Sequence, residues 1–86
     1  MKHIKKFEIM KIKVLLFGIL AEDSGKQTLQ VNDIDNTLAL TEHLMTQYPS
    51  FAKYKFRISV NQNLIDGNKK LNDGDEVALL PPFAGG

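Results

Sequence analysis

The last six residues of the chain begin with two prolines, which restrict the backbone, and end with two glycines, which have no side chain. Pro81 and Pro82 follow an apolar stretch, and Gly85 and Gly86 close the sequence. Because glycine has no Cβ, such an end can enter a narrow channel and bring its carboxylate close to another protein's backbone. The α-carboxylate of Gly86 is ionised near neutral pH, so it could attack the α-phosphorus of ATP supplied by another protein. The alternative is a frayed terminus without a role.

Other chemistry is restricted by what the sequence lacks. There is no cysteine, which removes disulfides, thiolate zinc sites, thiol nucleophiles and any persulfide. His3 and His43 are far apart, so a two-histidine metal site is not expected, and His43 is interpreted as a structural or surface residue. No glycine-rich phosphate-binding motif occurs, so no bound cofactor is expected and ATP would have to be held by a partner enzyme.

The size and charge of the chain indicate one small domain without a nucleic-acid or membrane partner. Its 86 residues carry a formal net charge of +1. Three bases and one acid lie in residues 1–9, so residues 10–86 carry eight bases against nine acids. A balance this close to neutral gives no electrostatic reason to bind nucleic acid or an anionic membrane. No apolar run approaches the length of a membrane span and no secretory leader is expected, so we predict a cytoplasmic protein.

The hydrophobic pattern predicts two strands, a helix and two further strands. Asn36 is the expected N-cap of the helix, because its side chain can accept from the first-turn N–H groups. Leu40, Leu44 and Tyr48 then recur at helical spacing, and Pro49 is expected to end the helix. The predicted strands are Met10 to Phe17, Gln27 to Val31, residues 53–60 (clearest from Phe56 to Asn61), and Glu76 to Leu80, with a short return at Leu64-Ile65. Residues 18–26, rich in glycine and turn formers, are predicted to be a turn that closes a hairpin.

This order of elements matches the β-grasp arrangement, an α+β fold in which one main helix packs across a mixed sheet. By analogy with that fold, the first and last long strands should lie side by side and parallel. We expect residues 1–9 to be a poorly ordered extension, residues 10–82 to form the β-grasp domain, and residues 83–86 to be a flexible tail.

The alternation also predicts an apolar patch beside the root of the tail. If Val77 and Leu79 face the helix, then Leu80 faces away from it and meets Phe17 on the neighbouring strand, where Leu64 could join them. A contiguous outward apolar patch suggests a partner surface. The alternative is that loops cover the patch.

Two other clusters have ordinary structural explanations. The basic and aromatic residues from Lys53 to Arg57 alternate, which is typical of an amphipathic strand rather than of a single-stranded nucleic-acid site. Asp73, Asp75 and Glu76 could supply acid–base pairs, but the Asn72-Asp73-Gly74-Asp75 sequence is better explained as a turn.

Residues 10–86 resemble the small subunits of molybdopterin synthase, a family of ubiquitin-like sulfur carriers. The resemblance is carried by Ile12-Lys13-Val14-Leu15-Leu16-Phe17, by Val60-Asn61-Gln62, and by the stretch from Asp73-Gly74-Asp75 through Pro81-Pro82 to the final Gly85-Gly86. The chain departs from the family at Ala21-Glu22, where arginine-glutamate is frequent. This puts in doubt any contact that the arginine makes in the family.

The resemblance implies a mechanism and a set of partners. A ubiquitin-activating-type adenylyltransferase would use ATP to adenylate Gly86, and a sulfur donor enzyme would convert the adduct to a thiocarboxylate. The tail would then enter a large catalytic subunit, with Gly85 permitting the close approach, and give its sulfur to cyclic pyranopterin monophosphate. The chain would thus be the non-catalytic subunit of a heteromeric sulfurtransferase. The implied partner-binding residues are Phe17, Leu64, Leu80, Pro81, Pro82 and Phe83.

Two alternatives stay open. The chain could carry sulfur for another pathway, such as thiamine synthesis or tRNA thiolation. It could also be a ubiquitin-like modifier that is attached to lysines. The double proline favours the molybdopterin synthase family, because thiamine-pathway carriers usually lack it.

Overall fold

The computed structural model describes residues 10–82. The predicted extension at 1–9 and the predicted tail at 83–86, including Phe83, Gly85 and Gly86, lie outside the described residues.

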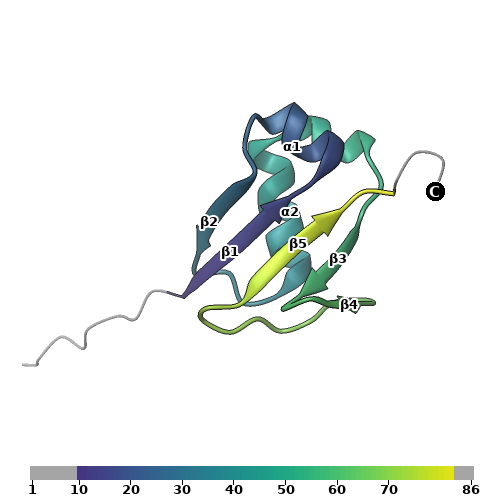
Figure 1. The fold of residues 1–86 in the computed structure, drawn as a ribbon. Coiled ribbons are helices and arrows are strands. Elements are labelled where there is room, and N and C mark those ends of the chain that lie inside the picture. Colours follow the sequence, from purple (N-terminus) through teal and green to yellow (C-terminus); the bar gives the residue numbers. More distant parts are fainter. Residues whose placement is uncertain (1–9, 83–86) are drawn as a thin grey trace, which may run out of the picture.

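The domain is built on a five-stranded mixed sheet (Figure 1). Its strands are β1 (Lys11–Leu16), β2 (Thr28–Asn32), β3 (Arg57–Val60), β4 (Asn63–Ile65) and β5 (Glu76–Leu80), in the order β2-β1-β5-β3-β4. The central pair β1–β5 is parallel, and the other three pairs are antiparallel. The predicted α+β class, β-grasp arrangement and parallel pairing are therefore confirmed.

The main helix, α2 (Thr37–Gln47), packs across one face of the sheet. Asn36 is its N-cap, as predicted, and its side-chain oxygen accepts from the backbone N–H of Ala39 at 2.8 Å. Leu40 and Leu44 are buried against the sheet. The helix ends before Pro49, where a 3₁₀ helix, η1 (Pro49–Lys53), begins.

The prediction of a simple turn over residues 18–26 was wrong, because a short helix, α1 (Gly18–Ser24), joins β1 to β2. The two glycines that suggested a turn lie at the two ends of this helix: Gly18 begins it at φ +56°, and Gly25 follows its last residue at φ +74°. Between them Leu20 is fully buried. Burial of that side chain stabilises a helical turn where the sequence otherwise favours a plain loop.

The prediction of a strand over residues 53–60 was too long at its beginning. Lys53 belongs to η1, and β3 spans only Arg57–Val60. Phe51 is fully buried and stacks on Tyr48 at 5.0 Å between ring centroids. The chain must therefore pass from the helical layer to the sheet after Phe51, and it pairs with β5 only from Arg57 onward.

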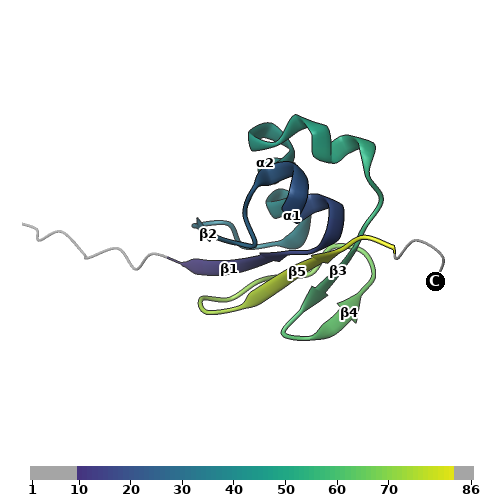
Figure 2. The same ribbon diagram turned by 45° about the horizontal axis from the view of Figure 1, so that its top comes forward.

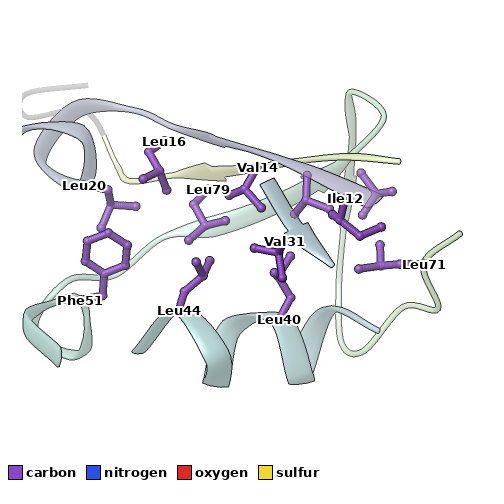
Figure 3. Close-up of a cluster of buried hydrophobic side chains, with 12 residues drawn as sticks. Ile12, Val14, Leu16, Leu20, Val31, Leu40, Leu44, Phe51, Leu71 and Leu79 are labelled. Carbon is purple, nitrogen blue, oxygen red and sulfur yellow. The ribbon is translucent and has the colours of Figure 1, made fainter. Parts of the chain in front are cut away.

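The core lies between the sheet and the helices (Figures 2 and 3). Both α1 and α2 cover the same face of the sheet. The side chains of β1 and β5 that point to this face alternate with those that point away, as the period of two requires. The inward set is Ile12, Val14 and Leu16 from β1 with Val77 and Leu79 from β5.

A network at the start of α2 ties the helix to the chain before β5. Thr37 is 1% exposed, and its Oγ1 accepts from the backbone N–H of Lys69 at 2.9 Å. The Oδ1 of Asn68 accepts from the backbone N–H of Leu38 at 2.9 Å. These bonds satisfy helix N–H and loop N–H groups that the helix itself leaves without partners.

We therefore expect Thr37→Val to destabilise the fold by about 1–3 kcal/mol, because it keeps the side-chain shape but leaves the Lys69 N–H without its acceptor. Thr41→Val is the matched control, since Thr41 Oγ1 only donates to the backbone oxygen of Thr37 within the same helix. Urea unfolding measures both variants. Equal stability of the two would contradict the network's role.

Candidate functional site

The face of the sheet opposite the helices, called here the outer face, carries one row of small and apolar side chains. Leu15 pairs with Ala78, Ala78 with Ser59, and Ser59 with Leu64. Ala78 and Ser59, in the middle of the row, are 8% and 6% exposed. The centre of the outer face is therefore almost inaccessible to solvent, although both of its side chains are small.

The outer face is polar at one end and apolar at the other. Lys13 pairs with Glu76 in the register of β1 and β5, with 3.9 Å between Nζ and Oε2. Further along both strands lie Leu15 and Ala78, and then Phe17 and Leu80. Because β1 and β5 are parallel, their apolar ends coincide at the edge where the chain leaves β5.

A groove of about 340 Å³ lies at this apolar end and is called here the tail-root groove. Leu80 lies beside Pro81 and Pro82 on one stretch of chain, and Leu64 of β4 completes the apolar lining. Leu64 is 55% exposed, so most of this apolar surface faces solvent. The full lining is Lys55, Phe56, Arg57, Leu64, Leu80, Pro81 and Pro82.

Phe17 lies on the other side of Leu80 from this groove. It directly follows Leu16, the last residue of β1, whose register partner Leu79 directly precedes Leu80. It is 45% exposed and borders a second hollow between β1, α1 and β2. The structure thus gathers Leu64, Leu80, Pro81 and Pro82 in one groove and places Phe17 at its flank.

Two basic side chains border the tail-root groove. Arg57 is directly paired with Leu80, and Lys55 lines the same hollow. The Nη2 of Arg57 lies 3.6 Å from Oδ1 of Asp66, but both side chains are solvent-exposed and the pair contributes little to stability. The alternation of residues 53–60 in the sequence indicates that Arg57 points outward. It does not indicate that Arg57 lies beside Leu80, because that depends on the pairing of β3 with β5.

The acidic residues near 73–76 have structural roles in this region, as the turn interpretation predicted. Asp73 Oδ1 accepts from the backbone N–H of Lys11 at 2.8 Å, and Asp75 Oδ2 accepts from that of Asn72 at 2.8 Å. Within residues 10–82, no group of three or more histidine and acidic side chains could hold a metal ion. His43 is half-buried on α2, away from the outer face.

Tyr54, between η1 and β3, has a perturbed hydroxyl. Partial burial raises the pKa of Tyr54, and a hydrogen bond to Asp23 together with the negative charges of Asp23 and Glu22 raises it further. A phenol whose pKa is raised stays neutral at physiological pH. The interaction with Asp23 joins α1 to the segment that leads into β3.

The arrangement is that of a β-grasp protein with an exposed apolar groove at the edge of the sheet where β5 ends. In the part of the chain that the structure describes, no helix is long and apolar enough to cross a membrane. The sequence model of the ThiS family matches residues 14–86, and the chain belongs to this family.

Relatives and solved structures are similar over nearly the whole chain. The molybdopterin synthase sulfur carrier subunit of Escherichia coli is 38% identical over 80 residues, covering 87% of this chain and 99% of that protein. Subunit 1 in the complex of subunits 1 and 2 of molybdopterin-converting factor from Helicobacter pylori superposes with a TM-score of 0.67 at 28% identity, covering 90% and 100% of the two chains. Small archaeal modifier protein 1 from Methanosarcina acetivorans superposes with a TM-score of 0.76 at 25% identity, covering 93% and 100%.

The exposure of Leu64 leads to a prediction about stability. We expect Leu64→Ser to change the free energy of unfolding by no more than about 0.5 kcal/mol, because the side chain is mostly in water already. Val60→Ser, on the preceding strand, should cost about 2–4 kcal/mol, because Val60 is 2% exposed and faces the core. Urea unfolding compares the two, and a comparable loss in Leu64→Ser would mean that Leu64 serves the fold rather than a partner.

Proposed function

We propose that the chain is the sulfur carrier subunit of a cytoplasmic molybdopterin synthase. The observation that carries this proposal is the course of β5, which runs from the centre of the sheet into Pro81 and Pro82 beside the exposed tail-root groove. Pro81 and Pro82 thus lie beside an apolar face, and the proposed reacting end, Gly86, follows Pro82 by four residues in the sequence. The names of the relatives and the membership of the ThiS family support the role.

The proposed chemistry begins at the carboxylate of Gly86. One carboxylate oxygen attacks the α-phosphorus of ATP held by a ubiquitin-activating-type adenylyltransferase, which forms an acyl-adenylate and releases pyrophosphate. A donor that delivers sulfur at the oxidation level of sulfide then attacks the acyl carbon. The new carbon–sulfur bond replaces the bond to AMP, AMP leaves, and Gly86 ends in a thiocarboxylate.

The second stage takes place in the large subunit. The thiocarboxylate sulfur forms a bond to a carbon of cyclic pyranopterin monophosphate in place of a carbon–oxygen bond, and the displaced oxygen stays on the opened phosphate or leaves as water. A second water then cleaves the bond between sulfur and the acyl carbon. This returns the Gly86 carboxylate, so the carrier can be charged again. A dithiolene contains two sulfurs, so each product requires two charged carrier chains.

The outer face is proposed to dock the large subunit. Phe17, Leu64 and Leu80 supply exposed or partly exposed apolar area, and Pro81 and Pro82 lie beside it. The family resemblance adds Phe83, which follows Pro82 in the sequence. The Helicobacter pylori structure of subunit 1 with subunit 2 supports a partner of this kind. Lys55 and Arg57 would place positive charge at the rim of the interface, where it affects the association rate more than the affinity.

The carrier chemistry predicts a defined change in mass. After incubation with the adenylyltransferase, ATP and a sulfide source, the intact protein should become heavier by the difference between one sulfur and one oxygen atom, with the change located at Gly86. Deletion of Gly86 should abolish sulfur transfer, because the carboxylate would stop one residue, about 3.4 Å, short of its position. Intact-mass spectrometry and a transfer assay measure these effects.

The deletion should leave the urea midpoint unchanged, and Gly86→Ala serves as the length-matched control. Retained transfer by the deletion variant would contradict the mechanism. Sulfur delivered to a thiamine precursor or a tRNA instead would favour a carrier for another pathway. Covalent conjugates of high mass on a denaturing gel would favour a modifier, which the similarity to small archaeal modifier protein 1 keeps as the second candidate.

The docking face predicts a difference between two equally exposed leucines. Leu64→Glu should weaken binding to the large subunit by about tenfold or more, because it places a charge in an interface that is desolvated on binding. Leu38→Glu is the matched control: Leu38 is also 55% exposed but lies on α2, on the helical side. Calorimetric titration of each variant with the large subunit measures the affinity, and equal weakening by the two would rule out the outer face as the site.

A further inference from the structure

Gly18 lies where the end of β1 meets the root of the tail. It follows Phe17 directly and begins α1. The register of β1 with β5 ends at Leu16 and Leu79. The chain leaves the sheet after Leu16 on β1, and β5 continues for one more residue, Leu80, before Pro81. A Cβ built on Gly18 would lie 3.2 Å from Cγ of Pro81, closer than carbon atoms normally pack.

Pro81 controls the direction in which the chain leaves the domain. The ring of each proline fixes φ near −65°, and a residue before proline is confined to extended conformations. Pro81 and Pro82 therefore continue β5 as a stiff segment. A rotation of Pro81 changes the direction of everything that follows it.

We infer that Gly18 is a positioning residue for the C-terminal tail. The absence of a side chain at Gly18 lets Pro81 lie against the start of α1, and this contact sets the line along which the chain beyond Pro82 leaves toward the large subunit. This inference rests on the proposed carrier function and adds to it a residue of α1 outside the sheet and the tail.

A glycine at position 18 also has a purely conformational explanation. Its φ of +56° lies in the left-handed region that glycine adopts without a steric penalty. The same helix offers a control for this explanation, because Gly25 ends α1 at φ +74° and a Cβ there would meet nothing within 4 Å. The two positions share the conformational requirement and differ in the contact with Pro81.

The experiment compares Gly18→Ala with Gly25→Ala in the full chain. Both should lower the urea midpoint, because both place an alanine at positive φ. The contact at 3.2 Å requires Pro81 to move by a few tenths of an ångström, and a change in its orientation produces a larger displacement four residues beyond Pro82, at Gly86. With each protein charged to the thiocarboxylate, Gly18→Ala should therefore reduce kcat/KM for sulfur transfer by roughly tenfold, since displacement of a reacting group by about 1 Å has effects of this order or larger. Gly25→Ala should remain within about twofold of the unsubstituted protein, a range too small to reflect a misplaced tail.

A second pair of variants tests the named contact. Pro81→Ala removes Cγ, so the addition of Gly18→Ala to Pro81→Ala should reduce kcat/KM by less than about twofold further. If Gly18→Ala reduces transfer as strongly in the Pro81→Ala background, the contact is not the cause. If Gly18→Ala does not fold, Gly18→Asn replaces it, because asparagine tolerates the left-handed region and still carries the Cβ.

A measurement without any partner separates this inference from the proposed function. Residual dipolar couplings of the Cα–Hα bonds of Pro81 and Pro82 report their orientation relative to the sheet. Gly18→Ala should change these couplings, and Gly25→Ala should not. Unchanged couplings in Gly18→Ala would overturn the positioning role. This would happen if the ring of Pro81 accommodated the added Cβ by a change of pucker alone. Failure of the unsubstituted protein to accept sulfur would instead overturn the proposed function.

Discussion

The parallel pairing of β1 with β5 is the constraint on which the rest of the structure depends. These two strands are the first and last along the described chain and lie next to each other in the sheet. Parallel neighbours need a long connection, and here that connection contains β2, both helices, β3 and β4. The core forms because this intervening chain folds back over one face. The apolar ends of both strands meet at one edge because the strands run in the same direction.

Much of this fold could be predicted from local patterns. The bounds of β5 were predicted from its alternation and the prolines that follow it, and Asn36 was predicted as the cap of α2. The short helix α1 could not be predicted, because Gly18 and Gly25 carry the same signal for helix ends as for a turn. The first residues of the predicted third strand alternate regularly, but the burial of Phe51 determines where the chain returns to the sheet.

The candidate site was predictable in its residue types and only partly in its geometry. Alternation along β5 indicated that Leu80 points outward, whereas Leu64 was expected only to be able to join the patch. The buried middle of the face consists of Ala78 and Ser59, which are placed side by side between Leu15 of β1 and Leu64 of β4 only by the register of the strands. The proximity of Gly18 to Pro81 depends on the same pairing, and nothing in the local sequence of either residue indicates it.

Successive side chains of a strand point to opposite faces of the sheet. Ala78 therefore faces outward, and its neighbours Val77 and Leu79 face the core. Substitutions at alternate positions of one strand are therefore exposed to different selection. A change in the inward set affects whether the chain folds. A change in the outward set leaves the core in place and, under the proposed function, affects whether a partner still recognises the chain. Such a scaffold can acquire a new partner by drift on one face while the other stays fixed. Descendants of one ancestral domain can in this way diverge in what they serve while keeping a common fold.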